Sequence, residues 1–246
     1  MLFRSRGNSS EGGKEYLGYL DGGFQLIIDE LEKRIKKMGG RINLNQNLPP
    51  RELGTSLDEG RLKSFDYIIS SSPLSNVDYL GAITIVFSSK QNLSKFYWHN
   101  INDTKSPFLA FIQHTNLVDK KNYDGKNIYY LGKYLHQNHH YFKDSDEKIS
   151  KDFFDYLEKI FPTFDRKKII EKHIFKFKYA QHIVGKNYQP RINPPQSSPS
   201  PFFDKTGRKN VSEEKIIHMN FAQIYPEDRG INYAVREAEK VATLFR

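Results

Sequence analysis

A turn before the last helical segment carries the residues best suited to chemistry. Residues 225–230 read Tyr-Pro-Glu-Asp-Arg-Gly and separate a strand candidate from an amphipathic segment. A helix that begins just after Gly230 presents unpaired backbone N–H groups and the positive end of its dipole. Such a helix end can hold a phosphate, a group of hydroxyls or the electron-rich edge of a ring. Asp228 has an alternative, purely structural role as the N-cap of the helix.

A group of histidines in the middle of the chain is a second candidate. His136, His139 and His140 have a spacing that could bind a metal ion on a helix, and Asp144 and Asp146 are close in sequence. No carboxylate or cysteine spacing completes a recognisable zinc site. We therefore predict no metal and interpret the group as a solvated loop.

Three further side chains could contact a substrate. His114 lies in a strand candidate beside Asn116, where both could face a cavity. A hydrogen-bonded histidine in the core or at its rim is the alternative. Trp98 could line a pocket, with aromatic packing in a sheet as its alternative. The sequence contains no Gly-x-Ser-x-Gly nucleophile motif and no P-loop.

Composition limits the class of protein. The 246 residues include 38 Lys and Arg, 29 Asp and Glu, and no cysteine. The missing thiols exclude a disulfide scaffold, a thiolate metal site and a cysteinyl flavin link. No run approaches the roughly 20 apolar residues of a membrane span, and residues 1–13 lack the apolar core of a signal peptide. We therefore expect a cytoplasmic protein without a membrane span.

The net charge of +9 could indicate nucleic acid, an anionic membrane surface or an anionic ligand. The basic residues are interspersed with acidic ones, as around Arg34, which lies near Glu30 and Glu32. Binding by counterion release needs a continuous basic stripe. We therefore interpret the charge as ordinary solvated surface and do not favour nucleic acid as a partner.

The elements that must position these residues follow an α/β pattern. Residues 24–38 have helical apolar spacing and Gly39 can end the helix, while residues 41–44 alternate as a strand. Residues 65–70 indicate a short buried strand, and residues 215–221 another. The buried face of the first helix is predicted to contain Phe24, Ile27, Ile28, Leu31, Ile35 and Met38. That of the last helix is predicted to contain Ile231, Ala234, Val235, Ala238, Val241, Ala242 and Phe245.

The middle of the chain predicts a sheet with helices. Strand candidates occupy residues 82–87, 107–114 and 127–135. One helix is predicted from the cap Ser150 to just before Pro162, and a shorter one near residues 166–173. Residues 175–179 then alternate rings and lysines as a strand whose lysines should be exposed.

Several segments resemble FAD-dependent amine oxidase-like flavoproteins, a superfamily with monoamine oxidases, protoporphyrinogen oxidases, phytoene desaturases and, more distantly, UDP-galactopyranose mutases. Residues 15–24 (Glu-Tyr-Leu-Gly-Tyr-Leu-Asp-Gly-Gly-Phe), with the helix and Gly-Gly-Arg-Ile that follow, resemble its middle segment. Residues 66–74 (Asp-Tyr-Ile-Ile-Ser-Ser-Ser-Pro-Leu) resemble its exit from the flavin domain. Residues 97–135 resemble the substrate-domain sheet of a bacterial and archaeal branch. Residues 223–236, the most specific piece, resemble its C-terminal flavin motif.

The resemblance implies FAD as cofactor and a flavin that accepts a hydride from a small-molecule substrate; sugar chemistry of the mutase kind is a variant. It places Asp228 on the ribityl chain and the amides of Gly230 and Ile231 near the N1/C2 oxygen region of the isoalloxazine. It also implies that Arg229 reaches a phosphate or the substrate and that Tyr225 lies near the ring.

The superfamily's G-x-G-x-x-G turn is missing from these residues. We therefore expect the C-terminal part of a longer flavoprotein, which binds FAD weakly or is inactive without an N-terminal FAD-binding segment from the same or an adjacent gene product. The predicted division is a flexible start (1–16), a partial FAD-binding domain (17–73 and 213–246) and a substrate domain (74–212) with a mainly antiparallel sheet and helices. The fold class is thus α/β or α+β.

A second hypothesis belongs to another class of protein. The chain could be a noncatalytic basic module that binds an anionic sugar nucleotide, a polysaccharide or nucleic acid. A steep salt dependence of oligonucleotide binding, without flavin binding, would favour this module.

Overall fold

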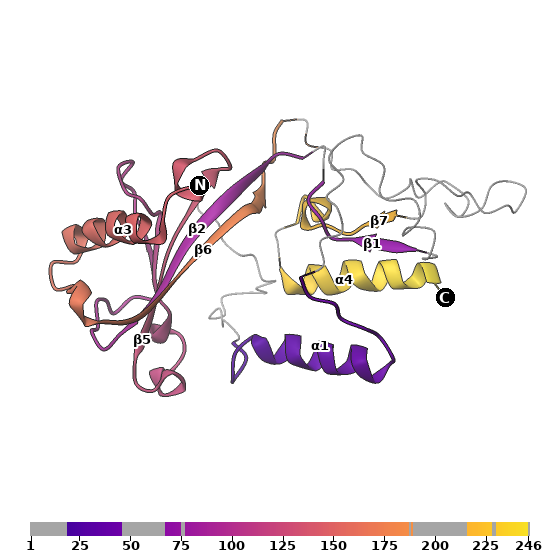
Figure 1. The fold of residues 1–246 in the computed structure, drawn as a ribbon, viewed down its shortest axis with the longest axis horizontal. Helices are drawn as coiled ribbons and strands as arrows, with labels where there is room; N and C mark the ends of the chain where they lie inside the picture. Colours follow the sequence, from indigo (N-terminus) through magenta and orange to yellow (C-terminus); the bar gives the residue numbers. More distant parts are fainter. Residues whose placement is uncertain are drawn as a thin grey trace, which may run out of the picture.

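The computed structural model describes residues 19–45, 67–74, 77–186, 188, 216–227 and 230–245, so the predicted flexible start lies outside the described residues. A five-stranded sheet with helix α3 forms one group of elements, and a two-stranded sheet with helices α1 and α4 forms the other (Figure 1). This mixture confirms the predicted α/β fold class. Within the described ranges, no helix is long and apolar enough to cross a membrane.

The larger sheet is antiparallel and has the strand order β3-β4-β5-β2-β6. It confirms all four strands predicted between residues 82 and 179. Strand β2 lies between β5 and β6 and pairs with both along most of its length. The strands are β2 (Tyr79–Ser89), β3 (Trp98–Asn100), β4 (Ala110–Gln113), β5 (Asn127–His136) and β6 (Ile169–His182).

Helix α3 (Asp146–Ile160) covers one face of this sheet and ends before Pro162, as predicted. Its N-cap is Ser145 and not the predicted Ser150. Ser145 has the extended backbone of an N-cap and accepts a hydrogen bond from the Lys148 amide at 3.3 Å, whereas Ser150 lies buried inside the helix. Glu147 in the first turn complements the helix dipole, so the helix begins a turn earlier than its apolar spacing indicates.

The main core lies between α3 and the sheet. Alternate residues of β2, β4 and β5 point toward α3, as the two-residue period of a strand requires, and they are fully buried. Aromatic rings fill much of this layer. Phe87, for example, stacks on Tyr129 with ring centroids 4.8 Å apart. The largest buried members are Ile83, Ile85, Phe87, Phe108, Phe111, Tyr129, Leu131, Ile149, Phe153 and Leu157.

Strand β6 overturns two predictions. The helix expected at residues 166–173 is a single 3₁₀ turn, η4 (Arg166–Lys168), because the residues from Ile169 onward pair with β2. The rings of this strand are exposed, 56% in the case of Phe177, whereas Lys176 is partly covered and reaches Asp146 at 2.9 Å. The side of β6 that carries Lys176 faces α3, so the alternation was predicted correctly, but of the two lysines only Lys178 is exposed as predicted.

The smaller sheet joins distant parts of the chain. Strand β1 (Ile68–Ser70) pairs in parallel with β7 (Ile216–His218). Both predicted strands are thus present in shortened form, with residues 65, 66 and 215 outside the described residues. The first was predicted to be buried, but none of its residues is, and Ile69 is half exposed. After β7 the chain does not stay extended to residue 221, because Asn220 caps the 3₁₀ turn η5 (Phe221–Ile224).

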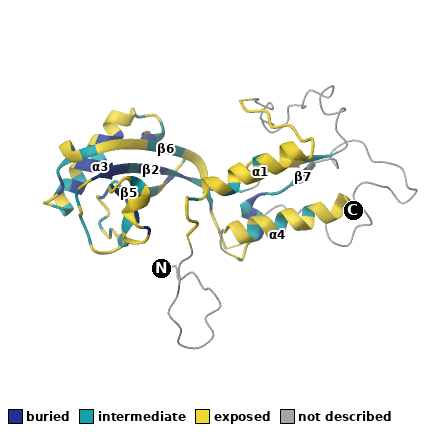
Figure 2. Cartoon of the chain, turned by 90° about the horizontal axis from the view of Figure 1, so that it is seen from below, coloured by how far each residue is buried: buried dark blue, intermediate teal, exposed yellow. Residues whose placement is uncertain are grey.

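Helices α1 (Gln25–Lys37) and α4 (Ile231–Ala242) confirm the predicted terminal helices, and Gly39 has the expected positive φ of 84°. Their apolar faces are not buried, contrary to prediction: no residue of either helix is buried (Figure 2). Residues 41–44 form no strand, contrary to prediction. Periodicity places apolar residues on one face, but burial requires a covering element, and none covers these faces among the described residues.

Candidate functional site

The carboxyl ends of β1 and β7 meet at one edge of the small sheet, the place where ligands bind in open α/β sheets. Asn220 ties the two ends together. Its side-chain amide donates to the carbonyls of Ser71 and Ser72 at 3.3 and 3.1 Å, and its Oδ1 accepts from the Ala222 amide at 2.9 Å. The hydroxyl of Tyr79 also donates to this oxygen at 3.3 Å. One largely buried side chain therefore sets the geometry of this edge.

An aromatic cluster connects this edge to the larger sheet. The ring of Tyr225 lies 5.2 Å from that of Tyr188, which stacks on His182 of β6 at 5.3 Å. The Tyr188 hydroxyl donates to the Ala222 carbonyl at 2.7 Å, and burial raises its pKa to about 12, so it remains a donor at neutral pH. Tyr225, a predicted flavin contact, is thus held beside the end of β6. The junction cluster is Tyr79, Tyr179, His182, Tyr188, Phe221 and Tyr225.

The N-terminus of α4 follows the same turn. Gly230 is the N-cap residue, has an extended backbone and provides no side-chain cap. Ile231 begins the helix and is exposed, and no acidic side chain lies in the first turn. The backbone amides of this helix end are therefore not capped by a side chain of the first turn. Asp228 and Arg229 lie outside the described residues, so their predicted contacts remain predictions.

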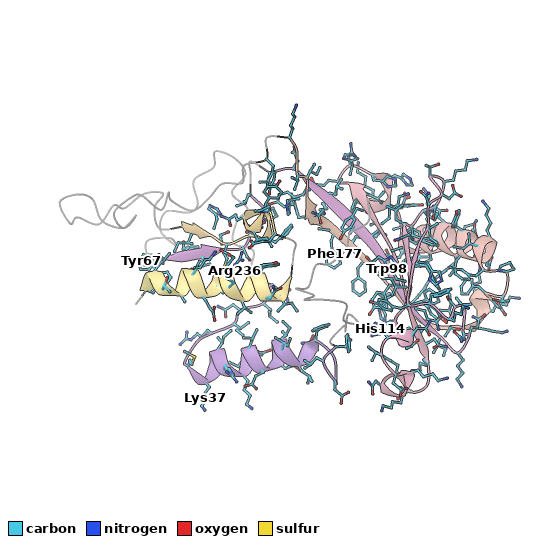
Figure 3. The ribbon with its side chains drawn as sticks, turned by 180° about the vertical axis from the view of Figure 1, so that it is seen from behind. Lys37, Tyr67, Trp98, His114, Phe177 and Arg236 are labelled. Atoms are coloured by element: carbon cyan, nitrogen blue, oxygen red, sulfur yellow. The ribbon has the colours of Figure 1, made fainter. Side chains whose placement is uncertain are left out.

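An ion pair braces this turn against α4. Both guanidinium NH groups of Arg236 donate to the Glu227 carboxylate, at 2.6 and 2.7 Å, and hold the pKa of that carboxyl below its usual value. Figure 3 shows Arg236 on α4 near the small sheet. Neither this pair nor Asn220 was predicted. For Asn220 a signal existed, because Asn220 and Gln223 have the spacing of a capping box, and the structure contains that box.

The side of the larger sheet away from α3, here called the open face, is a second candidate region. Cross-strand registers place Trp98, Ile112 and Tyr130 in one row, and Ala82 beside Phe177 in another. Ala110, Gly132 and Thr84 form the row between, which continues to Phe175 on β6, so small residues lie between aromatic side chains. Phe177 and Trp98 are more than half exposed and lie on the side toward α1 and α4 (Figure 3).

The three predicted substrate residues lie close together at one end of the open face. Trp98 is exposed, and its indole donates to Asn100 at 2.8 Å. The side-chain amide of Asn116 donates to the carbonyls of Ser94 and Phe96, both at 2.9 Å, and so holds the loop before β3. Among the three, Trp98 has the side chain best placed to meet a substrate.

His114 lies just beyond the end of β4 in a cluster of phenols. It is buried, and its Nε2 lies 2.8 Å from the Tyr123 hydroxyl. The rings of Tyr19 and Tyr130 pack on it at 5.1 and 5.8 Å. Burial lowers the pKa of His114, so the imidazole is neutral at pH 7 and can accept a proton. Tyr19, which precedes α1, brings the smaller group of elements into contact with the sheet.

The histidine group was predicted to be a loop without a metal. His139 caps a 3₁₀ turn by accepting from the Tyr141 amide, and His140 pairs with Asp144 at 2.6 Å. Among the described residues, no group of three or more potential ligands is arranged to hold a metal ion. These histidines therefore have structural partners within the turn.

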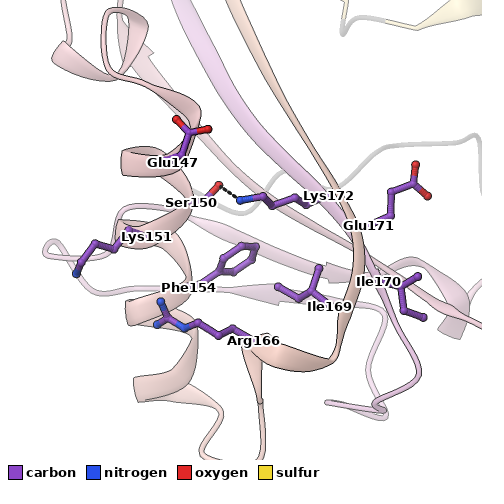
Figure 4. Close-up of a pocket in the computed structure, with 9 residues that line it drawn as sticks. All are labelled: Glu147, Ser150, Lys151, Phe154, Arg166, Ile169, Ile170, Glu171 and Lys172. Carbon is purple, nitrogen blue, oxygen red and sulfur yellow. Dashed lines mark hydrogen bonds between the residues drawn. The ribbon is translucent and has the colours of Figure 1, made fainter.

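A surface pocket of 430 Å³ lies between α3 and the start of β6 (Figure 4). Lys172 donates to Ser150 at 3.1 Å across it, and Arg166 at its edge is held by Asp155 and Glu158. Lys172 and Arg166 are thus already engaged in hydrogen bonds with side chains of the protein. It lies on the α3 side of the sheet, remote from the open face.

No known protein family and no curated protein matches the chain. Solved structures do match. A reduced UDP-galactopyranose mutase matches with a TM-score of 0.38 and 14% identity, over 47% of this chain and 29% of that chain. A protein from Exiguobacterium sp. 255-15, described provisionally as a protoporphyrinogen oxidase, matches with a TM-score of 0.58 and 15% identity, over 90% of this chain and 50% of that chain. The chain thus spans half the length or less of both structures, and over nine-tenths of its own length it shares the fold of the Exiguobacterium protein.

Proposed function

We propose that the chain is part of a FAD-dependent oxidoreductase. It contributes the turn before α4 to the flavin ring and the open face of the larger sheet to a small-molecule substrate. The fold shared with a protein described as a protoporphyrinogen oxidase supports this function, because the C-terminal motif resembles the same superfamily. The predicted domains, 17–73 with 213–246 and 74–212, are part of the proposal, as is an N-terminal segment that completes the cofactor site.

One observation carries the proposal. The N-terminus of α4, whose N-cap residue is Gly230, follows the carboxyl end of β7, and the junction cluster connects that end to the open face. A ring held at the helix end would therefore lie near the aromatic rows of the sheet. Neither feature is needed to stabilise an isolated sheet, and together they provide a cofactor region beside a substrate region.

The residues present fit the ring end of FAD. A helix N-terminus stabilises negative charge, as reduced flavin requires near N1, and the half-exposed Tyr225 provides an aromatic edge. Asp228 would hold the ribityl hydroxyls, and Arg229 a phosphate or the substrate. When bound, the flavin supplies a hydride acceptor. The adenosine and pyrophosphate would be held by the N-terminal segment, since the sequence has no G-x-G-x-x-G turn.

The chain's own residues would orient the substrate. Trp98 and Phe177 flank the row of small residues, so a flat or apolar substrate could lie across it and exclude water from the sheet. His114, neutral at pH 7 and bonded to Tyr123, would accept a proton at its end of the open face.

A flavin titration tests the proposal. The full chain should quench the fluorescence of riboflavin and of FAD with affinities within about threefold of each other, and ADP should not compete, because the contacts are to the ring end alone. Asp228→Ala should weaken the binding of riboflavin and of FAD by roughly tenfold or more, the effect expected from the loss of one hydrogen bond to a charged group. Asp165→Ala, which removes the cap of the 3₁₀ turn η4 before β6, is the matched control.

Two results would contradict the proposal. Competition by ADP would show that the chain binds the adenosine and pyrophosphate end of FAD and not the flavin ring. Absence of flavin binding, together with oligonucleotide binding that falls steeply with salt, would favour the basic binding module instead.

A further inference from the structure

We propose that the open face takes an uncharged, largely apolar and elongated substrate, and that it rejects anionic molecules such as sugar nucleotides. This inference rests on the proposed function and names the substrate class of its substrate region. Two features of the larger sheet carry it, the sorting of its charged side chains and the exposure of its aromatic rings.

Three lysines of the larger sheet lie on the side that faces α3. Lys172 donates to Ser150 at 3.1 Å and Lys176 pairs with Asp146 at 2.9 Å, so α3 holds both cations. Lys133 lies on the buried side of β5, and its ammonium donates to a backbone carbonyl at 2.6 Å. Each of these charges thus has a partner away from the open face. A fourth lysine follows Phe177 in the bulge of β6, outside the paired register.

The open face carries no basic side chain in the paired part of the described strands. The registers assign alternate residues of β2, β3, β4 and β5 to this face, together with the odd-numbered residues 171–177 of β6. None of these positions holds a lysine or an arginine, and the one acid is Glu171, which lies 2.8 Å from His173 Nε2. Although the chain contains 38 Lys and Arg, these strands therefore offer no such cation to a ligand on the open face.

Aromatic rings occupy both edges of the open face. On β6, the rings of Phe175 and Phe177 stack nearly parallel with centroids 6.2 Å apart, and the two side chains are 42% and 56% exposed. Trp98 on β3, at the opposite edge of the sheet, is 51% exposed (Figure 3). Because four strand spacings separate β3 from β6, a molecule that touches both edges spans roughly 19 Å. An elongated molecule with flat or conjugated parts fits this spacing.

Charge decides between the ligand classes that the sequence left open. A phosphate or carboxylate laid across this face would lose water without meeting a lysine or an arginine, and an unpaired charge against apolar side chains is strongly unfavourable. The carboxylate of Glu171 would add repulsion. An uncharged apolar molecule instead removes half-exposed rings from water and gives up little hydration of its own. The open face therefore favours an uncharged substrate, although the chain as a whole carries a net charge of +9.

Retinol and retinoate test this preference, because they share one elongated polyene skeleton and differ in the charge of a single end group. Trp98 is the only tryptophan in the sequence, so energy transfer from tryptophan to either polyene reports binding. At pH 7 the full chain should bind retinol about tenfold or more tighter than retinoate, since only retinoate brings an unpaired charge to the face. UDP-galactose, an anionic sugar nucleotide, should not displace retinol.

Two lysine variants locate the bound probe. Phe177→Lys removes a stacking ring and supplies a cation on the open face, so it should lower the preference for retinol by about tenfold or more. Ile170→Lys adds the same charge to β6 at the pocket beside α3, where Ile170 is half exposed, and should leave the preference unchanged. Because both replaced side chains are exposed, both variants should keep the circular dichroism spectrum of the wild type.

The opposite outcomes overturn the inference. Retinoate bound as tightly as retinol, or retinol displaced by UDP-galactose, would show that the face accepts anions. Equal effects of the two lysine variants, or no energy transfer to either polyene, would show that the open face does not bind the probe. A preference for retinol in a chain that binds no flavin would refute the proposed function alone, whereas flavin binding with a preference for retinoate would refute the substrate class alone.

Discussion

Replacing Asn220 by alanine should loosen the edge where the predicted cofactor turn begins. The substitution removes the cap on the Ala222 amide and the two bonds to the carbonyls of Ser71 and Ser72. Loss of an asparagine cap costs about 1 kcal/mol, and loss of the long carbonyl bonds adds about 1 kcal/mol. The Tyr79 hydroxyl still accepts from the Leu74 amide but loses the acceptor of its own proton, and because that bond to Asn220 is long, at 3.3 Å, its loss adds little. The expected total is about 2 kcal/mol.

Native-state hydrogen exchange measures this effect locally. The Met219 amide donates to the Ser70 carbonyl at 2.9 Å, and its protection should fall roughly 30-fold, as about 2 kcal/mol requires. The Ile85 amide in the larger sheet serves as the internal reference and should change little. Asn116→Ala is the matched control, because that side chain also donates to two carbonyls but in the other sheet.

Two results would refute this reasoning. Unchanged protection of the Met219 amide would show that Asn220 does not hold the edge together. An equal fall at the Ile85 amide would show that the small sheet opens only with the whole chain, and the two groups of elements would then be one cooperative unit.

Further predictions concern the larger sheet. Gly81→Ala should destabilise the chain by about 1–3 kcal/mol in urea unfolding, because a Cβ there would meet the Phe142 ring and would lie 2.7 Å from the Phe177 carbonyl oxygen. Gly132→Ala, with its nearest neighbour at 3.8 Å, should be close to neutral, and equal effects of the two would rule out crowding as the cause. Stability should fall as the pH drops below 6.5, because burial lowers the pKa of His114 and the unfolded chain then binds the proton more readily. His114→Gln should flatten the difference between urea midpoints at pH 7 and pH 5; an unchanged slope would assign the dependence to other groups.

The elements that depend on local pattern were predicted well. Strands β2 and β5 follow from dense β-branched and aromatic runs, α1 follows from helical spacing with a glycine stop, and α4 follows from helical spacing. These signals depend on neighbours within a few residues, so the sequence contains them directly. The start of α3 was misplaced because the apolar spacing that predicts the helix begins just after Ser150. The serine with the backbone and hydrogen bond of an N-cap is Ser145.

The candidate site was predicted less completely. Tyr225, Gly230 and Ile231 were named from a motif, and the structure places them at a helix end beside the junction cluster. Asn220 and Tyr188 were missed, because their roles depend on residues up to 149 positions away in sequence. Contacts of that range leave no local pattern, and the capping-box spacing of Asn220 and Gln223 indicates only the turn that follows β7.

The sequence by itself determined most of the helices and strands, because apolar period and turn chemistry are local properties; it misassigned residues 41–44 and 166–173. Tertiary structure decided which sides are covered. The rings of β6 are exposed because α3 lies on the other face of the sheet, and α1 is exposed because none of the described elements covers it. Amphipathic spacing shows that a helix or strand has two sides, but burial is a property of the partner that removes water from one of them.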